Sequence, residues 1–230
     1  MGPRARDLLQ SLSPDDLSND AFPFGTSREI ELGFATVRAS RISYVGELGW
    51  ELYIPSEFTT GVWDVLVEAG ESYGLRQVGM HAMNSLRIEK AYRHYGHDIT
   101  DADTPLEGGL GFAVKFDKPG GFVGREALKR QKEAGLNKRL VQFLLGDPDP
   151  MLYHNEPIWR DGNLAGYVRS AMYGHTLGAA VALGYVENPD GVDAEYVNSG
   201  TYEIEIAGVR YPATASLRPL YDPKSERIKA

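Results

Sequence analysis

Two stretches, LAGYVRSAMY at residues 164–173 and AAVALGYV at residues 179–186, decide how the second half of the chain folds. Both are rich in β-branched, aromatic and small apolar residues, and a short glycine-bounded connection separates them, as is typical of neighbouring strands. The pattern recurs at LVQFLL (140–145), TYEIEIAG (201–208) and VRYPATA (209–215), with turns such as RDGN (160–163) between strands. Short strands separated by Gly, Pro and Asp turns predict a small β-barrel or β-sandwich from residue 139 onward.

The first half of the chain alternates between strand and helix patterns. Residues 30–54 follow a period of two, with the tight connection GELG at 46–49, which predicts paired strands. Amphipathic periodicity predicts helices over residues 2–12, 56–74 and 81–95. We expect the 56–74 helix to bury a face made of Val62, Trp63, Leu66 and Val67. The alternation predicts an α+β layer structure, with a domain boundary near residue 138.

The composition excludes several classes of function. The chain has 230 residues, 24 Lys and Arg against 32 Asp and Glu, and a net charge of −8, which argues against a nucleic-acid partner. Cysteine is absent, so disulfides, thiolate metal sites and a Cys nucleophile are excluded, and we predict a cytoplasmic protein. The most apolar stretch, 177–186, is about half the length that a membrane span needs, so we expect no membrane partner.

Common catalytic and metal-binding motifs are absent from the sequence. It contains no P-loop and no G-x-S-x-G elbow, and GGLGFAV (108–114) lacks the glycine spacing of a dinucleotide site. His94, His97 and Asp98 lie close together in RHYGHDI, but Gly96 interrupts a helix there and no further ligand is near in sequence. We therefore predict no metal site.

The segment RISYVGELGWELYI (41–54) is the best candidate for a binding site. Period-two counting places Trp50 and Leu52 on one face of a strand and Glu51 on the other, with Tyr44 approaching from the preceding strand. A carboxylate beside an aromatic ring can bind a planar heterocycle that carries two adjacent N–H donors. From spacing alone, a solvated glutamate on an exposed strand face is the favoured explanation of the pattern.

The same segment resembles the Tyr-(Thr/Val)-Gly-Glu-x-Gly-x-Glu signature of the glycine-cleavage T-protein (aminomethyltransferase) family. The resemblance continues, in order, through residues 85–99 (SLRIEKAYRHYGHDI), 104–128, 174–186 and 218–223 (RPLYDP). SLRIEKAYRHYGHD and VGELGWEL are most similar to the folate-binding C-terminal part of dimethylglycine and sarcosine dehydrogenases.

The resemblance implies an α+β fold in which a ferredoxin-like α/β lobe is followed by a small C-terminal β-barrel lobe. We accordingly expect residues 1–138 to be a partial folate-binding domain and residues 139–230 to be the barrel domain. The partial domain would comprise the stub of a truncated first lobe (1–35), the ferredoxin-like lobe (36–118) and a linker helix (119–138).

The resemblance also implies tetrahydrofolate as the cofactor and a one-carbon donor amine as the substrate. The implied folate-binding residues are Glu51, for the amino-pyrimidine edge of the pterin, and Tyr44, Glu47, Trp50 and Tyr221. FAD would belong only to a flavin-dehydrogenase partner or a missing domain. The family places an arginine where this sequence has Met83, so that contact is not carried over. Arg87 and Glu89 match the family run, with a structural role on the helix as the alternative.

Family members have a further region before the point that matches Gly2 and Pro3, and that region carries the catalytic aspartate. We therefore assign no catalytic residue, and we expect the chain to act as part of a larger methylene-transfer enzyme and to be inactive alone. The alternative is a non-catalytic folate-binding or subunit-interaction module, a pseudoenzyme. The incomplete first lobe predicts an exposed apolar patch near Leu8, Leu12 and Phe34.

Residues 115–139 are the one basic stretch, with eight Lys and Arg against three Asp and Glu. A solvated linker helix explains such a stretch. The alternative is an attraction for the polyglutamate tail of a folate.

Overall fold

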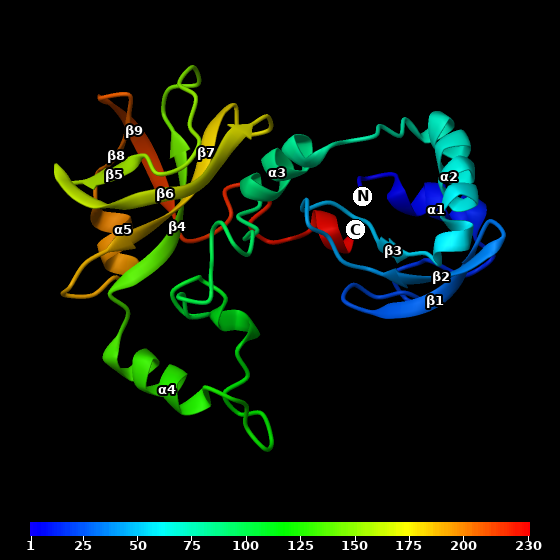
Figure 1. The fold of residues 1–230 in the computed structure, drawn as a ribbon, viewed down its shortest axis with the longest axis horizontal. Coiled ribbons are helices and arrows are strands. Elements are labelled where there is room, and N and C mark those ends of the chain that lie inside the picture. Colours follow the sequence, from blue (N-terminus) through cyan, green and yellow to red (C-terminus); the bar gives the residue numbers. More distant parts are fainter. The chain divides into compact units, whose positions relative to one another are not determined.

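The computed structural model describes residues 1–230, which form two compact units (Figure 1). Met1–Met83 and Lys224–Ala230 make up the first unit, and Asn84–Pro223 make up the second. The first unit is thus assembled from both ends of the sequence. None of the helices is long and apolar enough to cross a membrane.

The first unit is one antiparallel sheet with two helices on one face (Figure 1). The strands lie in chain order, and the helices are packed against each other. Its elements are α1 (Ala5–Leu12), β1 (Ser27–Leu32), β2 (Ala35–Ser40), β3 (Glu51–Tyr53), the 3-10 turn η1 (Ser56–Phe58), α2 (Thr59–Tyr73) and the 3-10 turn η3 (Arg227–Lys229).

The two faces of this sheet differ in polarity because side chains alternate along a strand. Ile30, Val37 and Ala39 are buried with the helices. The opposite face carries Glu29, Arg38 and Tyr53, one from each strand and in register with one another. The sheet therefore presents an open polar face.

Two expectations for the apolar residues of this unit are wrong. Leu8 is only 7% exposed and Leu12 packs against the core, because α1 closes over the sheet beside α2; only Phe34, in the β1–β2 turn, is exposed, at 96%. Trp63 is 52% exposed, since a single sheet covers only a narrow stripe of α2, centred on Val62.

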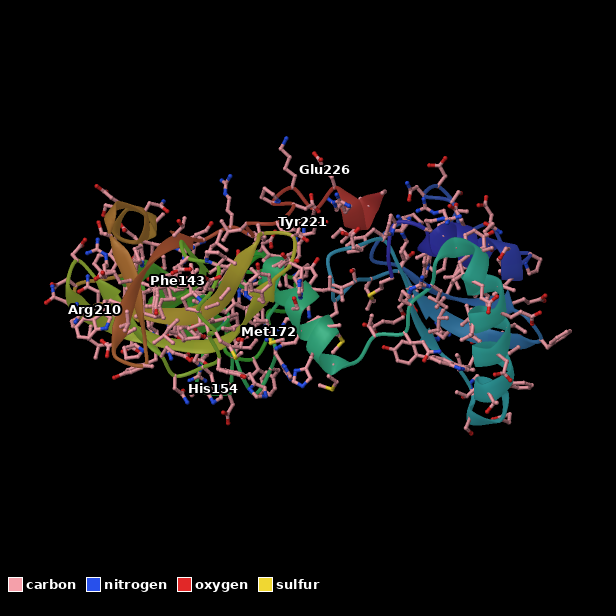
Figure 2. The ribbon with its side chains drawn as sticks, turned by 90° about the horizontal axis from the view of Figure 1, so that it is seen from above. Phe143, His154, Met172, Arg210, Tyr221 and Glu226 are labelled. Atoms are coloured by element: carbon pink, nitrogen blue, oxygen red, sulfur yellow. The ribbon has the colours of Figure 1, made fainter.

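The second unit contains a closed antiparallel barrel, which confirms the predicted C-terminal barrel. The strand order around it is β4-β7-β6-β5-β8-β9, and Phe143 lies fully buried inside (Figure 2). Its strands are β4 (Lys138–Leu145), β5 (Pro157–Arg160), β6 (Asn163–Gly174), β7 (Ala179–Glu187), β8 (Tyr202–Ile206) and β9 (Val209–Ser216).

Two tight hairpins set the register of the barrel. Asp161 and Gly162 between β5 and β6 have φ of 51° and 80°, and Ala207 and Gly208 between β8 and β9 have 50° and 82°. Successive positive φ angles define the turn whose twist matches paired strands, and glycine adopts it without steric cost. The sequence pattern did not predict β5 or the short helix α5 (Ala194–Ser199) that Asp193 caps.

Helix α3 (Met80–Glu89) packs against the outside of the barrel. Ile88 is buried with Leu183 and Tyr185, so β7 is covered on both faces. The predicted helix continued to Tyr95, but α3 ends at Glu89 and Ala91 has a φ of 54°, a left-handed conformation that a helix cannot continue through. The turn η2 (Gly111–Ala113) and α4 (Arg125–Ala134) connect this region to β4.

Candidate functional site

The connection between β2 and β3, residues 41–50, contains most of the predicted folate-binding residues. Tyr44 and Glu47 lie in bends of this connection; the expectation that Tyr44 lies on a strand is wrong, because β2 ends at Ser40. The hydroxyl of Ser43 accepts the backbone N–H groups of Val45 and Glu47 at 3.3 and 3.2 Å. This local turn replaces the hydrogen bonds of a strand ladder.

Glu51 is the first residue of β3 and lies on the polar face of the sheet, as the period of two predicts. Its Oε2 accepts a hydrogen bond of 3.1 Å from the Tyr53 hydroxyl. That bond, together with the negative charge of Glu51, raises the pKa of Tyr53. Glu51 is half-buried, so its carboxylate is fixed in direction and still reachable.

Trp50, the last residue of the connection, lies in the core of the first unit and is only 6% exposed. Its ring packs edge-on against Phe22 at 5.9 Å, with the Arg41 and Arg6 guanidinium groups 5.6 and 5.9 Å from the ring centroid. Its Nε1 has no hydrogen-bond partner. Trp50 thus anchors the start of β3 in the core, next to Glu51 in the sequence.

Arg41 anchors the beginning of the 41–50 connection. It is 1% exposed, and its Nη1 donates to the Phe22 carbonyl at 2.7 Å. Burial, with a further contribution from Arg6, lowers the pKa of Arg41. At the other side of the connection, the Glu47 carboxylate lies 3.6 Å from the Arg227 guanidinium.

Tyr221, the remaining predicted folate contact, belongs to the second unit (Figure 2). Its backbone N–H donates to the Glu89 carbonyl at 3.3 Å. The next residue, Asp222, accepts from the buried ammonium of Lys90 through its backbone carbonyl and, at 2.8 Å, through Oδ2. The RPLYDP segment is therefore held at the end of α3.

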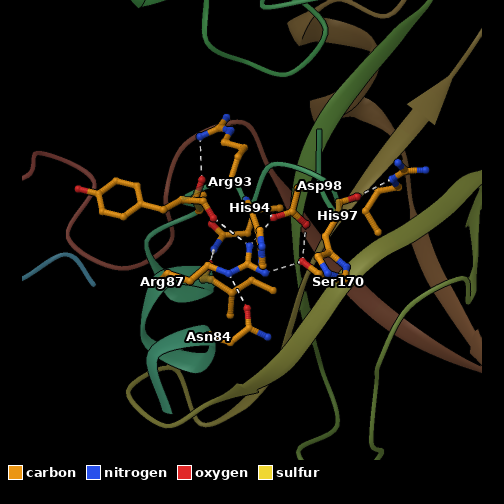
Figure 3. A network of polar contacts seen from close by, with 12 residues as sticks. Asn84, Arg87, Arg93, His94, His97, Asp98 and Ser170 are labelled. Carbon is orange, nitrogen blue, oxygen red and sulfur yellow. Dashed lines mark hydrogen bonds and ion pairs between the residues drawn. The ribbon is translucent and has the colours of Figure 1, made fainter. Parts of the chain in front are cut away.

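Arg87 connects α3 to the barrel through a buried network (Figure 3). Its guanidinium donates to Asp98 and, at 3.0 Å, to the Ser170 hydroxyl, which itself donates to Asp98. Asp98 also accepts the backbone N–H of His94 at 2.8 Å. Arg87 and Asp98 are 1% and 0% exposed, so this ion pair is shielded from water.

Glu89 has a similar role on the β6–β7 hairpin. Its Oε1 accepts the backbone N–H groups of Thr176 and Leu177 at 2.8 and 3.0 Å. The structure therefore favours the structural alternative for both Arg87 and Glu89.

Sequence reasoning missed three residues that build these regions: Tyr53, Arg41 and Lys90. Tyr53 was detectable, because it lies two positions after Glu51 on the same strand face. The partners of Arg41 and Lys90 are distant in sequence, in Phe22 and Asp222. No local pattern could have identified them.

Two family models together match most of the chain. The GCVT N-terminal domain matches residues 1–118, and the glycine cleavage T-protein C-terminal barrel domain matches residues 138–222. These matches cover the 41–54 segment, α3 and all strands of the barrel.

The chain is also similar to individual proteins. It is 44% identical to human mitochondrial sarcosine dehydrogenase over 99% of the chain and 25% of that protein. It is 40% identical to the mouse mitochondrial pyruvate dehydrogenase phosphatase regulatory subunit over 96% of the chain and 26% of that protein. It thus spans about a quarter of the length of these relatives.

A solved structure, the glycine cleavage system aminomethyltransferase T from Bartonella henselae, has the same fold. It superposes with a TM-score of 0.81 at 25% identity, over 97% of this chain and 58% of that one.

Proposed function

The chain belongs to the glycine cleavage T-protein family, and from that membership we propose that it is the folate-binding portion of a tetrahydrofolate-dependent one-carbon transfer enzyme. The enzyme would be of the aminomethyltransferase or dimethylglycine/sarcosine dehydrogenase type. The observation that carries the proposal is Glu51, a directed and reachable carboxylate on an open sheet face.

The Glu51 carboxylate fits the donor pattern of a pterin. An ionised carboxylate offers about four acceptor positions, and the Tyr53 hydroxyl occupies one. The amino group and adjacent ring N–H of the pterin would take two others in a planar, bidentate arrangement. Glu51 would bind the pterin ring and fix its orientation. Tetrahydrofolate held in this way would supply the nitrogen that captures the one-carbon unit.

The other predicted residues support this assignment in different ways. Tyr44 and Glu47 lie in the connection that leads to Glu51. A direct folate contact by Trp50 stays a prediction, and its buried ring supports β3 from behind. Tyr221 also stays a predicted folate contact, with its backbone fixed by α3.

We expect catalysis to use groups of a larger enzyme of which this chain is a part. We place proton transfer to the folate nitrogen on a carboxylate of that larger enzyme. We place FAD in a flavin-dehydrogenase domain or subunit. The match to sarcosine dehydrogenase covers only 25% of that protein, which leaves the rest of its length for such a domain. The one-carbon donor would be a small amine. A cytoplasmic location of the protein stays a prediction.

A second candidate function is a non-catalytic folate-binding or subunit-interaction module. The similarity to a regulatory subunit, at 40% identity, favours this alternative. The two candidates differ in turnover, because only the first predicts methylenetetrahydrofolate formation from formaldehyde and tetrahydrofolate when the flavin-bearing partner is present.

A titration with 5-formyltetrahydrofolate tests the pterin assignment. Losing a hydrogen bond to a charged group costs about 1.5–3 kcal/mol, so Glu51→Gln is expected to weaken binding roughly tenfold to a hundredfold. Glu29→Gln is the matched control, because Glu29 is exposed on the same face and pairs only with Arg38. Equal dissociation constants for the wild type and Glu51→Gln would refute the assignment.

A further inference from the structure

Residues 224–230, here called the strap, follow the barrel but are part of the first unit. They lie beyond residue 222, where the match to the family barrel model ends. The strap contains η3, and Ile228 within it is only 5% exposed. A buried isoleucine shows that the strap is packed against the unit and is not a loose tail.

The strap contacts the 41–50 connection at one of the predicted folate residues. Arg227 Nη1 lies 3.6 Å from Glu47 Oε2, and the two side chains are 54% and 18% exposed. Glu47 is the glutamate of the GELG turn, four residues before Glu51. An ion pair with a residue 180 positions further along the chain therefore contributes to the direction of its carboxylate.

A second contact holds the beginning of the same connection. The backbone carbonyl of Ala230 accepts hydrogen bonds from Arg41 Nη2 at 3.0 Å and from Arg6 Nη2 at 2.7 Å. Arg41 is 1% exposed and otherwise donates to the Phe22 carbonyl. The carbonyl at residue 230 thus accepts one of the hydrogen bonds of the buried Arg41 guanidinium. Leaving a buried, charged N–H group without a partner would cost folding free energy.

We propose that the strap is a working part of the folate site of the first unit, with Arg227 as a positioning residue for Glu47. Beyond Arg41, whose backbone still bonds to Gly25 and Thr26, the 41–50 connection has no strand pairing. Its conformation is therefore set by the Ser43 turn, by the Gly2 N–H, which donates to the Leu48 carbonyl at 2.7 Å, and by the two strap contacts. This inference rests on the proposed function, because it assigns the strap to the same ligand.

The test replaces Arg227 by methionine, which keeps a long, unbranched side chain and removes the positive charge. A partly exposed ion pair contributes about 0.2–1 kcal/mol, so Arg227→Met is expected to weaken 5-formyltetrahydrofolate binding by up to about fivefold. Arg227→Lys should restore part of the affinity. Lys229→Met removes an equal charge from the strap and should bind as the wild type does.

A double-mutant cycle separates positioning from general support of the fold. If Arg227 acts through Glu47, Arg227→Met has no further effect on affinity in a Glu47→Gln background. Hydrogen exchange of residues 43–49 in the ligand-free protein should also be faster in Arg227→Met than in Lys229→Met. Wild-type affinity in Arg227→Met, or the same loss in both backgrounds, overturns the inference.

The outcome for Glu51→Gln shows which proposal fails. Weakened binding by Glu51→Gln with wild-type binding by Arg227→Met removes only the role of the strap. Equal binding by Glu51→Gln and the wild type removes the pterin assignment, while a loss in Arg227→Met would still place the ligand beside Glu47. A wild-type chain that does not bind the folate overturns both.

Discussion

Asp103 shows how much a single side chain can depend on its surroundings. Its Oδ1 accepts from Lys138 at 2.7 Å, and its Oδ2 accepts from the backbone and hydroxyl of Thr100 at 2.8 and 3.0 Å. Burial acts to raise its pKa, but the bonds from Lys138 and Thr100 outweigh it, so the pKa of Asp103 lies below its ordinary value. The ionised form is therefore the one that stabilises the fold.

Asp103→Asn is expected to lower the free energy of unfolding at pH 7 by about 1–3 kcal/mol, because it removes a bond between charged groups. A lowered pKa in the folded state contributes stability that is present above the unfolded pKa of about 4 and lost as the pH falls through the folded value. The difference from the wild type should therefore shrink below about pH 4. Urea unfolding at several pH values measures it, with exposed Asp101→Asn as the control. A constant difference would contradict the prediction.

At the scale of an element, α3 depends on a buried ion pair to stay on the barrel. Asp98→Ala leaves Arg87 charged and unpaired in a site that is 1% exposed, which is expected to cost about 3–5 kcal/mol. Adding Arg87→Met removes the stranded charge, so the double variant should recover part of the loss. Denaturant unfolding of the three variants measures this. A double variant that is less stable than Asp98→Ala would show that the buried Arg87 charge does not destabilise the fold when its counter-ion is removed.

The elements also show what the sequence could predict. The barrel strands were predictable because each is bounded by turn residues such as Asp161 and Gly162, and the face of Glu51 followed from the period of two. The end of α3 was not predictable, because helical periodicity continues past Glu89, whereas Ala91 has a left-handed conformation and is buried against the barrel. The prediction that Trp63 is buried was wrong for a related reason. Periodicity identifies the apolar face of a helix but not the width of the layer that covers it.

At the scale of the whole molecule, each unit has its own hydrophobic core. Such units often unfold separately, so calorimetry is expected to show two transitions. Val37→Ala, in the first unit, should shift one, and Asp98→Ala, in the second, should shift the other. A single transition that moves with both variants would contradict independent unfolding.

The strap has a consequence for protein synthesis. A growing chain leaves the ribosome with its N-terminal end first, and domains generally fold as they emerge. The sheet and helices of the first unit leave the ribosome before the barrel, but their last packing partners, Arg227, Ile228 and Ala230, leave after it. Arg6 and Arg41 must therefore remain without the residue-230 carbonyl while the whole barrel is translated. The first unit therefore completes its packing only after the barrel has been made.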